Sequence, residues 1–117
     1  MSDDTVDLPR DIDPHKAVDR IIINSKKYAK AKAERIYIEE YRKSLKAIIM
    51  KRSLESSVNA QEREAYSHPE YTDWLKKLQI AIEVEEQLRW EMVAAQARVE
   101  VWRSQEASNR TMDKVSL

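Results

Sequence analysis

Glutamates are the side chains of this sequence with the clearest potential for chemistry, because several stand close together. Glu39 adjoins Glu40, and a second group comprises Glu83, Glu85 and Glu86. Paired carboxylates can act as general acid and general base when a pocket separates their pKa values. On a long charged helix they are more often solvated, or paired with Lys or Arg one turn away. We therefore predict no catalytic residues and expect the protein not to be an enzyme.

The other residues that could support chemistry are few. The two histidines, His15 and His68, each adjoin a proline, and the chain has no cysteine. A histidine-carboxylate metal site in a helical bundle uses Glu-x-x-His on an inward face, and this motif does not occur. Without glycine the sequence cannot form a phosphate-binding loop either. We predict no metal site, no cofactor and no small-molecule substrate.

The most specific candidate for binding is the basic stretch "NSKKYAKAKAERIY". Basic side chains neutralise phosphates and tyrosine rings can stack on bases, so this stretch could bind nucleic acid. The opposing interpretation is a helix face that is solvated or that pairs with the acidic second helix. Residues 16–57 carry a net charge of +7 and residues 58–104 one of −3. The candidate nucleic-acid-binding residues are Lys26, Lys27, Tyr28, Lys30, Lys32 and Arg35.

Composition indicates the elements that would position these residues. Among 117 residues there is no glycine and there are only three prolines. Chains without glycine lack the residue best suited to tight hairpin turns, and the abundant Ala, Glu, Lys, Arg and Leu favour helices. The fold class is therefore predicted to be all-α. Two long helices at about 14–55 and 69–108, joined by a connector at 56–68, would form an antiparallel, coiled-coil-like hairpin over residues 13–108.

Capping signals fix the expected helix starts. Asp13 followed by Pro14 is typical of an N-cap and a first helical position. Ser67 and Glu70 have the spacing of a capping box for the second helix, next to a possible Tyr66–Tyr71 staple. We expect an acidic disordered tail over 1–12 and a frayed end over 109–117.

Apolar residues of the second helix follow the alternating three-and-four spacing of a coiled-coil seam. The predicted seam comprises Tyr71, Trp74, Leu78, Ile82, Glu85, Leu88, Met92, Ala95, Val99 and Trp102. A second stripe comprises Ile80, Val84, Trp90, Ala94, Ala97 and Val101. The first helix shows two less regular lines, one of Ile22, Ala29, Ala33 and Ile36 and one of Ile38, Tyr41, Leu45 and Ile48.

Apolar residues on more than one side of a helix require more than one neighbour. A single hairpin gives each helix one neighbour, so we predict a homodimer that forms a four-helix bundle. Trp90 and Trp102, about 120° apart around the helix axis, would then face different partners. Glu85 interrupts the seam, and we predict that it sets the register by pairing with Lys43 or Arg42.

The apolar runs are far shorter than the ~20 residues that span a bilayer, and the basic stretch lacks adjacent bulky apolar residues. We therefore expect no membrane contact. The acidic start of the chain differs from a signal peptide. A cytoplasmic location is expected, which is the host cytoplasm if a phage encodes the protein.

Three stretches, "AKAERIYIEEYRKSLKAIIM", "AQEREAYSHPEY" and "ARVEVWRSQEASNR", resemble small helical proteins of tailed bacteriophages and prophages. The resemblance implies a non-enzymatic accessory or adaptor protein of phage DNA replication or recombination, which acts through protein contacts and either touches DNA directly or holds a recombination protein. Two alternatives remain open. One is a phage inhibitor that binds a host protein through an exposed helix face, with the acidic tail imitating nucleic acid, and the other is a structural virion component.

Overall fold

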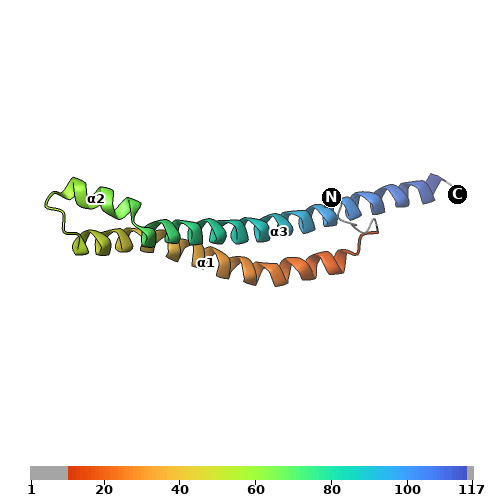
Figure 1. Ribbon diagram of the computed structural model, residues 1–117. Coiled ribbons are helices and arrows are strands. Elements are labelled where there is room, and N and C mark those ends of the chain that lie inside the picture. The colour runs from red at the N-terminus through yellow and green to blue at the C-terminus, as the bar shows by residue number, and fades with distance from the viewer. Residues whose placement is uncertain (1–10, 116–117) are drawn as a thin grey trace, which may run out of the picture. The chain divides into compact units, whose positions relative to one another are not determined.

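A computed structural model of the protein describes residues 11–115, and every regular element in this range is a helix (Figure 1). The helices are α1 (Pro14–Arg52), α2 (Val58–Ser67) and α3 (Pro69–Val115). The predicted all-α class and the two long antiparallel helices are confirmed. Assembly into a four-helix bundle stays a prediction.

The chain falls into two compact units, and each contains a segment of both long helices. One unit is Lys26–Arg89, in which α1 and α3 run in opposite directions and α2 lies between them in sequence. The described part of the other unit consists of residues 11–25 and 90–115, where the start of α1 accompanies the second half of α3.

Helix α1 begins where the capping signal places it. The Asp13 carboxylate accepts hydrogen bonds from the backbone N–H groups of His15 (2.9 Å) and Lys16 (3.3 Å), and Pro14 occupies the first helical position. Ten of the twelve residues of the predicted acidic tail lie outside the described residues, and Asp11 and Ile12 precede the helix. The helix ends at Arg52, with Lys51 and Arg52 in its last turn.

The predicted connector contains a helix of its own. Ser57 caps α2 by accepting a hydrogen bond from the Ala60 N–H (3.1 Å). The predicted capping box at the start of α3 is wrong, because the Ser67 hydroxyl donates back to the carbonyls of Arg63 and Glu64 and so closes α2. His68 takes the capping role instead: its Nδ1 accepts from the Glu70 N–H at 3.1 Å.

The predicted frayed end is also wrong for residues 109–115, which continue α3 to Val115. Nothing in "ASNRTMDKV" interrupts a helix, since it contains neither glycine nor proline. The Thr111 hydroxyl donates to the Ala107 carbonyl one turn back (3.0 Å), as helical threonines commonly do. None of the helices among residues 11–115 is long and apolar enough to cross a membrane.

Both long helices carry a heptad seam of buried and half-buried residues. On α3 its members are Tyr71, Trp74, Leu78, Ala81, Glu85, Leu88, Met92, Ala95, Val99 and Trp102. The prediction was wrong at one step, since the seam passes from Leu78 to Ala81 and leaves Ile82 exposed. On α1 the seam comprises Ala17, Ile21, Asn24, Tyr28, Ala31, Arg35, Ile38, Arg42, Leu45 and Ile49.

The best-packed region lies within the unit Lys26–Arg89, where α2 joins the two long helices. Leu45, Ile49, Ala65 and Tyr71 form a buried cluster, against which Tyr41, Met50 and Trp74 pack. Rings of Tyr66 and Tyr71 meet edge to face at 5.4 Å, so the predicted contact forms, although with His68 as the N-cap the two residues no longer have the positions of a staple. The Lys46 ammonium ties α1 to α2 by donating to Glu62 (2.6 Å) and to the Tyr66 hydroxyl (2.7 Å).

Candidate interaction surface

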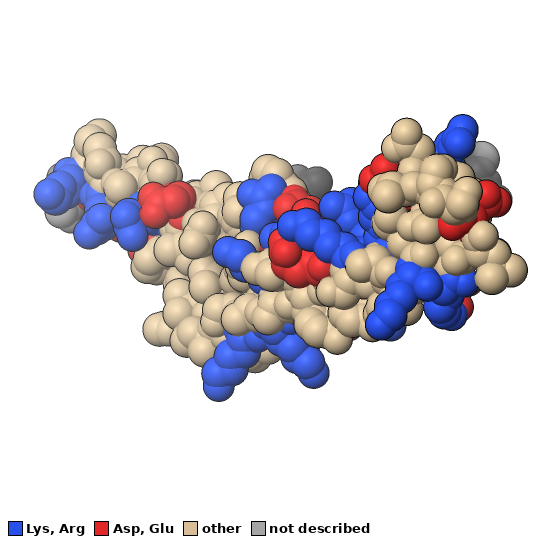
Figure 2. Space-filling view, turned by 90° about the vertical axis from the view of Figure 1, so that its left-hand side faces the viewer, with Lys and Arg blue, Asp and Glu red and all other residues tan. Residues whose placement is uncertain are grey.

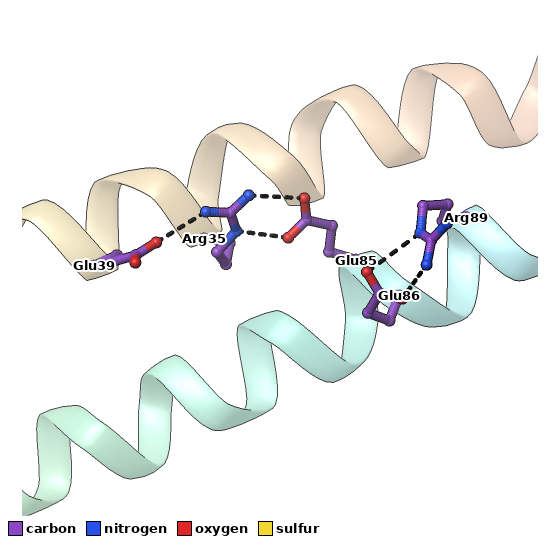
Figure 3. A network of polar contacts seen from close by, with 5 residues as sticks. All are labelled: Arg35, Glu39, Glu85, Glu86 and Arg89. Atoms are coloured by element: carbon purple, nitrogen blue, oxygen red, sulfur yellow. Dashed lines mark hydrogen bonds and ion pairs between the residues drawn. The ribbon is translucent and has the colours of Figure 1, made fainter.

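A buried ion pair joins the seams of α1 and α3 in the unit Lys26–Arg89 (Figure 3). The Arg35 guanidinium donates to both carboxylate oxygens of Glu85, from Nε at 2.6 Å and from Nη2 at 3.1 Å. Its Nη1 donates to Glu39 at 2.8 Å. Glu85 is only 6% exposed, so this bidentate pair satisfies a charge that water cannot reach.

The predicted partners of Glu85, Lys43 and Arg42, are wrong. Arg42 lies seven residues beyond Arg35, which is about 10 Å along the helix axis, and Lys43 instead pairs with Glu40 at 3.3 Å. Arg35 occupies the seam position of α1 that meets Glu85. The prediction that Glu85 has a basic partner on the other helix is right, but the partner is Arg35, two turns of α1 before the predicted residues.

The contacts shift the pKa values of both partners. Hydrogen bonding to Arg35 lowers the pKa of Glu85 below the ordinary glutamate value, against the opposing effect of burial. Hydrogen bonds to Glu85 and then Glu39 raise the pKa of Arg35 above its already high value. Both groups therefore stay charged at neutral pH.

A further polar contact lies in the seam of the other unit. Asn24 is buried on α1, and its side-chain amide donates to Glu91 of α3 at 3.1 Å. Each unit thus has a buried polar seam residue that contacts the other long helix, Glu85 in one and Asn24 in the other. Buried polar groups in a coiled coil favour the register that satisfies them.

The residues of the predicted nucleic-acid site are not gathered on one face. Lys26, Lys27, Lys30 and Lys32 are exposed, whereas Tyr28 is half-buried in the seam. Arg35 is engaged by Glu85 and Glu39. On the face drawn in Figure 2, Lys and Arg form several separate groups with acidic and other residues between them. The structure therefore keeps Lys26, Lys27 and Lys30 on one side of α1, places Lys32 on another side, and removes Tyr28 and Arg35 from the candidate surface.

Most of the predicted core residues lie in the seam, namely Trp74, Leu78, Glu85, Leu88, Met92, Val99 and Trp102. Trp90 lies outside it and is 57% exposed, whereas Trp102 is half-buried. The two tryptophans thus have different surroundings, as their angular separation predicts. Large apolar side chains outside the seam stay exposed, among them Val18, Ile22, Ile23, Ile36, Ile80, Ile82, Val84 and Val101.

A groove runs between α1 and α3 within the unit Lys26–Arg89, and we call it the α1–α3 groove. It consists of two hollows of about 370 Å³ and 220 Å³ that share Ala31, Glu34 and Val84. Its apolar lining comprises Ala31, Ile38, Ile80, Ala81, Val84 and Leu88. The polar lining comprises Lys27, Lys30, Glu34, Lys77 and Gln87.

Small side chains account for the hollow. Ala31 and Ala81 lie in the seams of α1 and α3, and both line the groove, so neither fills the space between the helices. Sequence reasoning missed the groove because it took Ile82 as the seam residue in place of Ala81. The signal available in the sequence was the heptad from Ala17 through Ala31 to Leu45, with Ala81 in register on the other helix.

The two histidines and the glutamates Glu83 and Glu86 lie at a helix start or on a helix surface. His15 is exposed in the first turn of α1, and His68 caps α3. Glu86 pairs with Arg89 at 2.8 Å on α3 (Figure 3), and Glu83 is exposed. Across residues 11–115, no group of three side chains suited to a metal ion comes together.

Comparisons with protein-family models, curated proteins and solved structures found no match for this chain. The resemblance to small phage proteins therefore stays a prediction that rests on the three quoted stretches.

Proposed function

We propose that the protein is a non-enzymatic helical adaptor that acts through contacts with other proteins and associates with itself as a homodimer. The observation that carries this proposal is the distribution of apolar residues on α3 in the unit Lys26–Arg89. Ile80, Ile82 and Val84 each expose more than two fifths of their surface, while the smaller Ala81 occupies the seam between them. A side chain of this size gains roughly 1.5–3 kcal/mol on full burial.

Exposed apolar residues indicate a binding surface only when they cluster, because single exposed apolar residues are ordinary on protein surfaces. Ile80 and Val84 are one helical turn apart and both line the α1–α3 groove. They therefore form part of one concave apolar surface, which is the form that a helix-binding site takes. This clustering favours a protein partner over a merely solvated helix.

The setting that we propose is phage DNA replication or recombination, which rests on the resemblance of the three stretches alone. An inhibitor of a host protein would use the same exposed helix face. The two roles differ in the partner, so a partner captured from infected cells would separate them.

Self-association is expected to be visible by sedimentation at micromolar concentration, as a species of twice the 13.8 kDa chain mass. Replacing Ile80 and Val84 with glutamine should weaken the dimer at least about tenfold, a change of 1.4 kcal/mol in binding. The matched control is Gln79→Ala, an exposed polar position on the same turn, which should leave the dimer unchanged. A wild-type protein that sediments as a monomer would contradict the proposal.

Direct contact with DNA is a second candidate function, and one observation favours it. Lys26, Lys27, Lys30 and Lys32 are exposed, and among the described residues none of them forms an ion pair within 4 Å. Lys26, Lys27 and Lys30 lie within about 100° of one another around the axis of α1, and three cations on one side of a helix can displace counterions from a nucleic-acid backbone.

A gel shift with single- and double-stranded DNA at two salt concentrations would test this contact. Lys26→Glu combined with Lys30→Glu should weaken binding by roughly tenfold at low salt and flatten its salt dependence. Lys51→Glu with Lys76→Glu is the matched control, because it changes the net charge equally at exposed lysines elsewhere in the same unit. Equal losses in the two variants would leave only a non-specific effect of net charge, and no shift at low salt would refute the contact.

A further inference from the structure

The α1–α3 groove has more basic than acidic residues in its lining, and contacts within the groove do not neutralise the excess positive charge. Lys27, Lys30 and Lys77 line it against a single acidic residue, Glu34. Lys77 lies over the Trp74 ring, 4.8 Å from its centroid, a cation–π contact that leaves it without an acidic partner in the described part of the chain. Lys27 and Lys30 form no ion pair with any described residue. The groove is therefore apolar within and basic at its edges.

This charge argues against two copies packing groove to groove. A two-fold axis would place the same three lysines of each copy against one another. Like charges brought together at an interface oppose association and have to be compensated by the partner. The occupant that fits best is an acidic segment that also offers apolar side chains to Ile80 and Val84.

The chain itself contains such a segment, in the ten residues that precede the described ones. Residues 3–8, "DDTVDL", carry three aspartates and no basic side chain. Val6 and Leu8 are two positions apart, so in an extended conformation they point to the same side. The segment would then offer the apolar pair Val6 and Leu8 together with the negative charges of Asp3, Asp4 and Asp7.

We propose that the α1–α3 groove of one copy binds residues 3–8 of a second copy in an extended conformation. Val6 contacts Ile80 and Leu8 contacts Val84, so that Asp4, on the same side of the extended segment, lies toward Lys77 at the Ile80 end of the groove. Asp3 and Asp7 lie on the opposite side of the segment and add negative charge above the groove. The lengths agree, because residues 27–38 of α1 extend over about 16 Å and six extended residues span about 17 Å between their first and last Cα atoms. The inference rests on the proposed self-association and names one contact through which it occurs.

Engineered cysteines would test the contact without interference, because the natural chain contains none. Full-length protein with Leu8→Cys is mixed with full-length protein carrying Val84→Cys and a size tag, and a mild oxidant is added. A disulfide-linked heterodimer is expected on a non-reducing gel. The matched control replaces Val84→Cys with Ile82→Cys, since these side chains are 46% and 43% exposed on the same helix but only Val84 lines the groove. The groove position should cross-link at least tenfold faster.

Charge exchange adds a second measurement. Lys77→Glu in the Val84→Cys chain should slow cross-linking, and Asp4→Lys in the Leu8→Cys chain should restore it. Equal rates at positions 82 and 84, or a charge reversal without effect, would overturn the inference. If wild-type protein still sediments as a dimer in that case, the proposed self-association stands and uses another surface. A monomeric wild-type protein would overturn both.

Discussion

Ile49→Ala is expected to lower the free energy of unfolding by about 2–4 kcal/mol. Ile49 is 3% exposed and belongs to the cluster with Leu45, Ala65 and Tyr71 that joins α1, α2 and α3. Truncation removes three carbon atoms from a closely packed site and leaves a cavity that a helical framework fills only in part. Denaturant unfolding followed by circular dichroism would measure the loss.

The neighbouring residue provides a matched control for this prediction. Ile48 has the same side chain on the same turn of α1 but is 45% exposed. Ile48→Ala should cost less than about 1 kcal/mol, because water already reaches much of the side chain. Similar losses in the two variants would mean that α1 does not present Ile49 to the cluster. A loss at Ile48 that grows with protein concentration would instead place that residue in the dimer interface.

The long helices could be predicted from sequence because local signals agree over long stretches. No glycine interrupts them, and the Asp13 cap with Pro14 marks a helix start that needs no tertiary contact to form. The connector was harder, because "SHP" can close one helix or open the next. Ser67 makes its bonds backwards to α2, and His68 caps α3 instead.

The seam of α1 could not be found from apolar periodicity, because much of it is not apolar. Asn24, Arg35 and Arg42 occupy seam positions, while large residues such as Ile22 and Ile36 stay exposed. A heptad search weighted by hydrophobicity therefore selects the line from Ile22 to Ile36, which lies outside the seam, and recovers only Ile38 and Leu45 of the seam itself. With the α1 seam unknown, the partner of Glu85 could not be identified by register.

The candidate surface was predictable only in part for a similar reason. That the four lysines are exposed on α1, with Lys26, Lys27 and Lys30 on one side and Lys32 on another, follows from helical geometry. A groove depends on which small residues face each other across two helices, and that depends on their register. Alanines such as Ala31 and Ala81 give no distinctive signal in the sequence. Their small size nevertheless leaves the space that Lys27, Lys30 and Lys77 border.

Glu85→Gln should destabilise the protein at neutral pH, with a fall in the midpoint of thermal unfolding of about 5 °C or more. The substitution keeps the shape of the side chain but removes the charge that the Arg35 guanidinium contacts at 2.6 Å and 3.1 Å. Arg35 would then keep only Glu39 as an ionic partner. Glu83→Gln is the matched control, because Glu83 is exposed on the same helix turn and should tolerate the loss of its charge.

The difference between wild type and Glu85→Gln should itself depend on pH. Since Arg35 lowers the pKa of Glu85 below 4.5 in the folded protein, the unfolded state takes up this proton at a higher pH than the folded state does. The stabilisation is therefore complete above the unfolded pKa and is lost as the pH falls through the lower folded value. Glu70, whose pKa Arg52 also lowers, contributes equally to both proteins and cancels in the comparison. Thermal unfolding measured from pH 7 to pH 3 should thus show the two midpoints converging below about pH 4.5, whereas a constant gap would show that the Glu85 charge does not stabilise the fold.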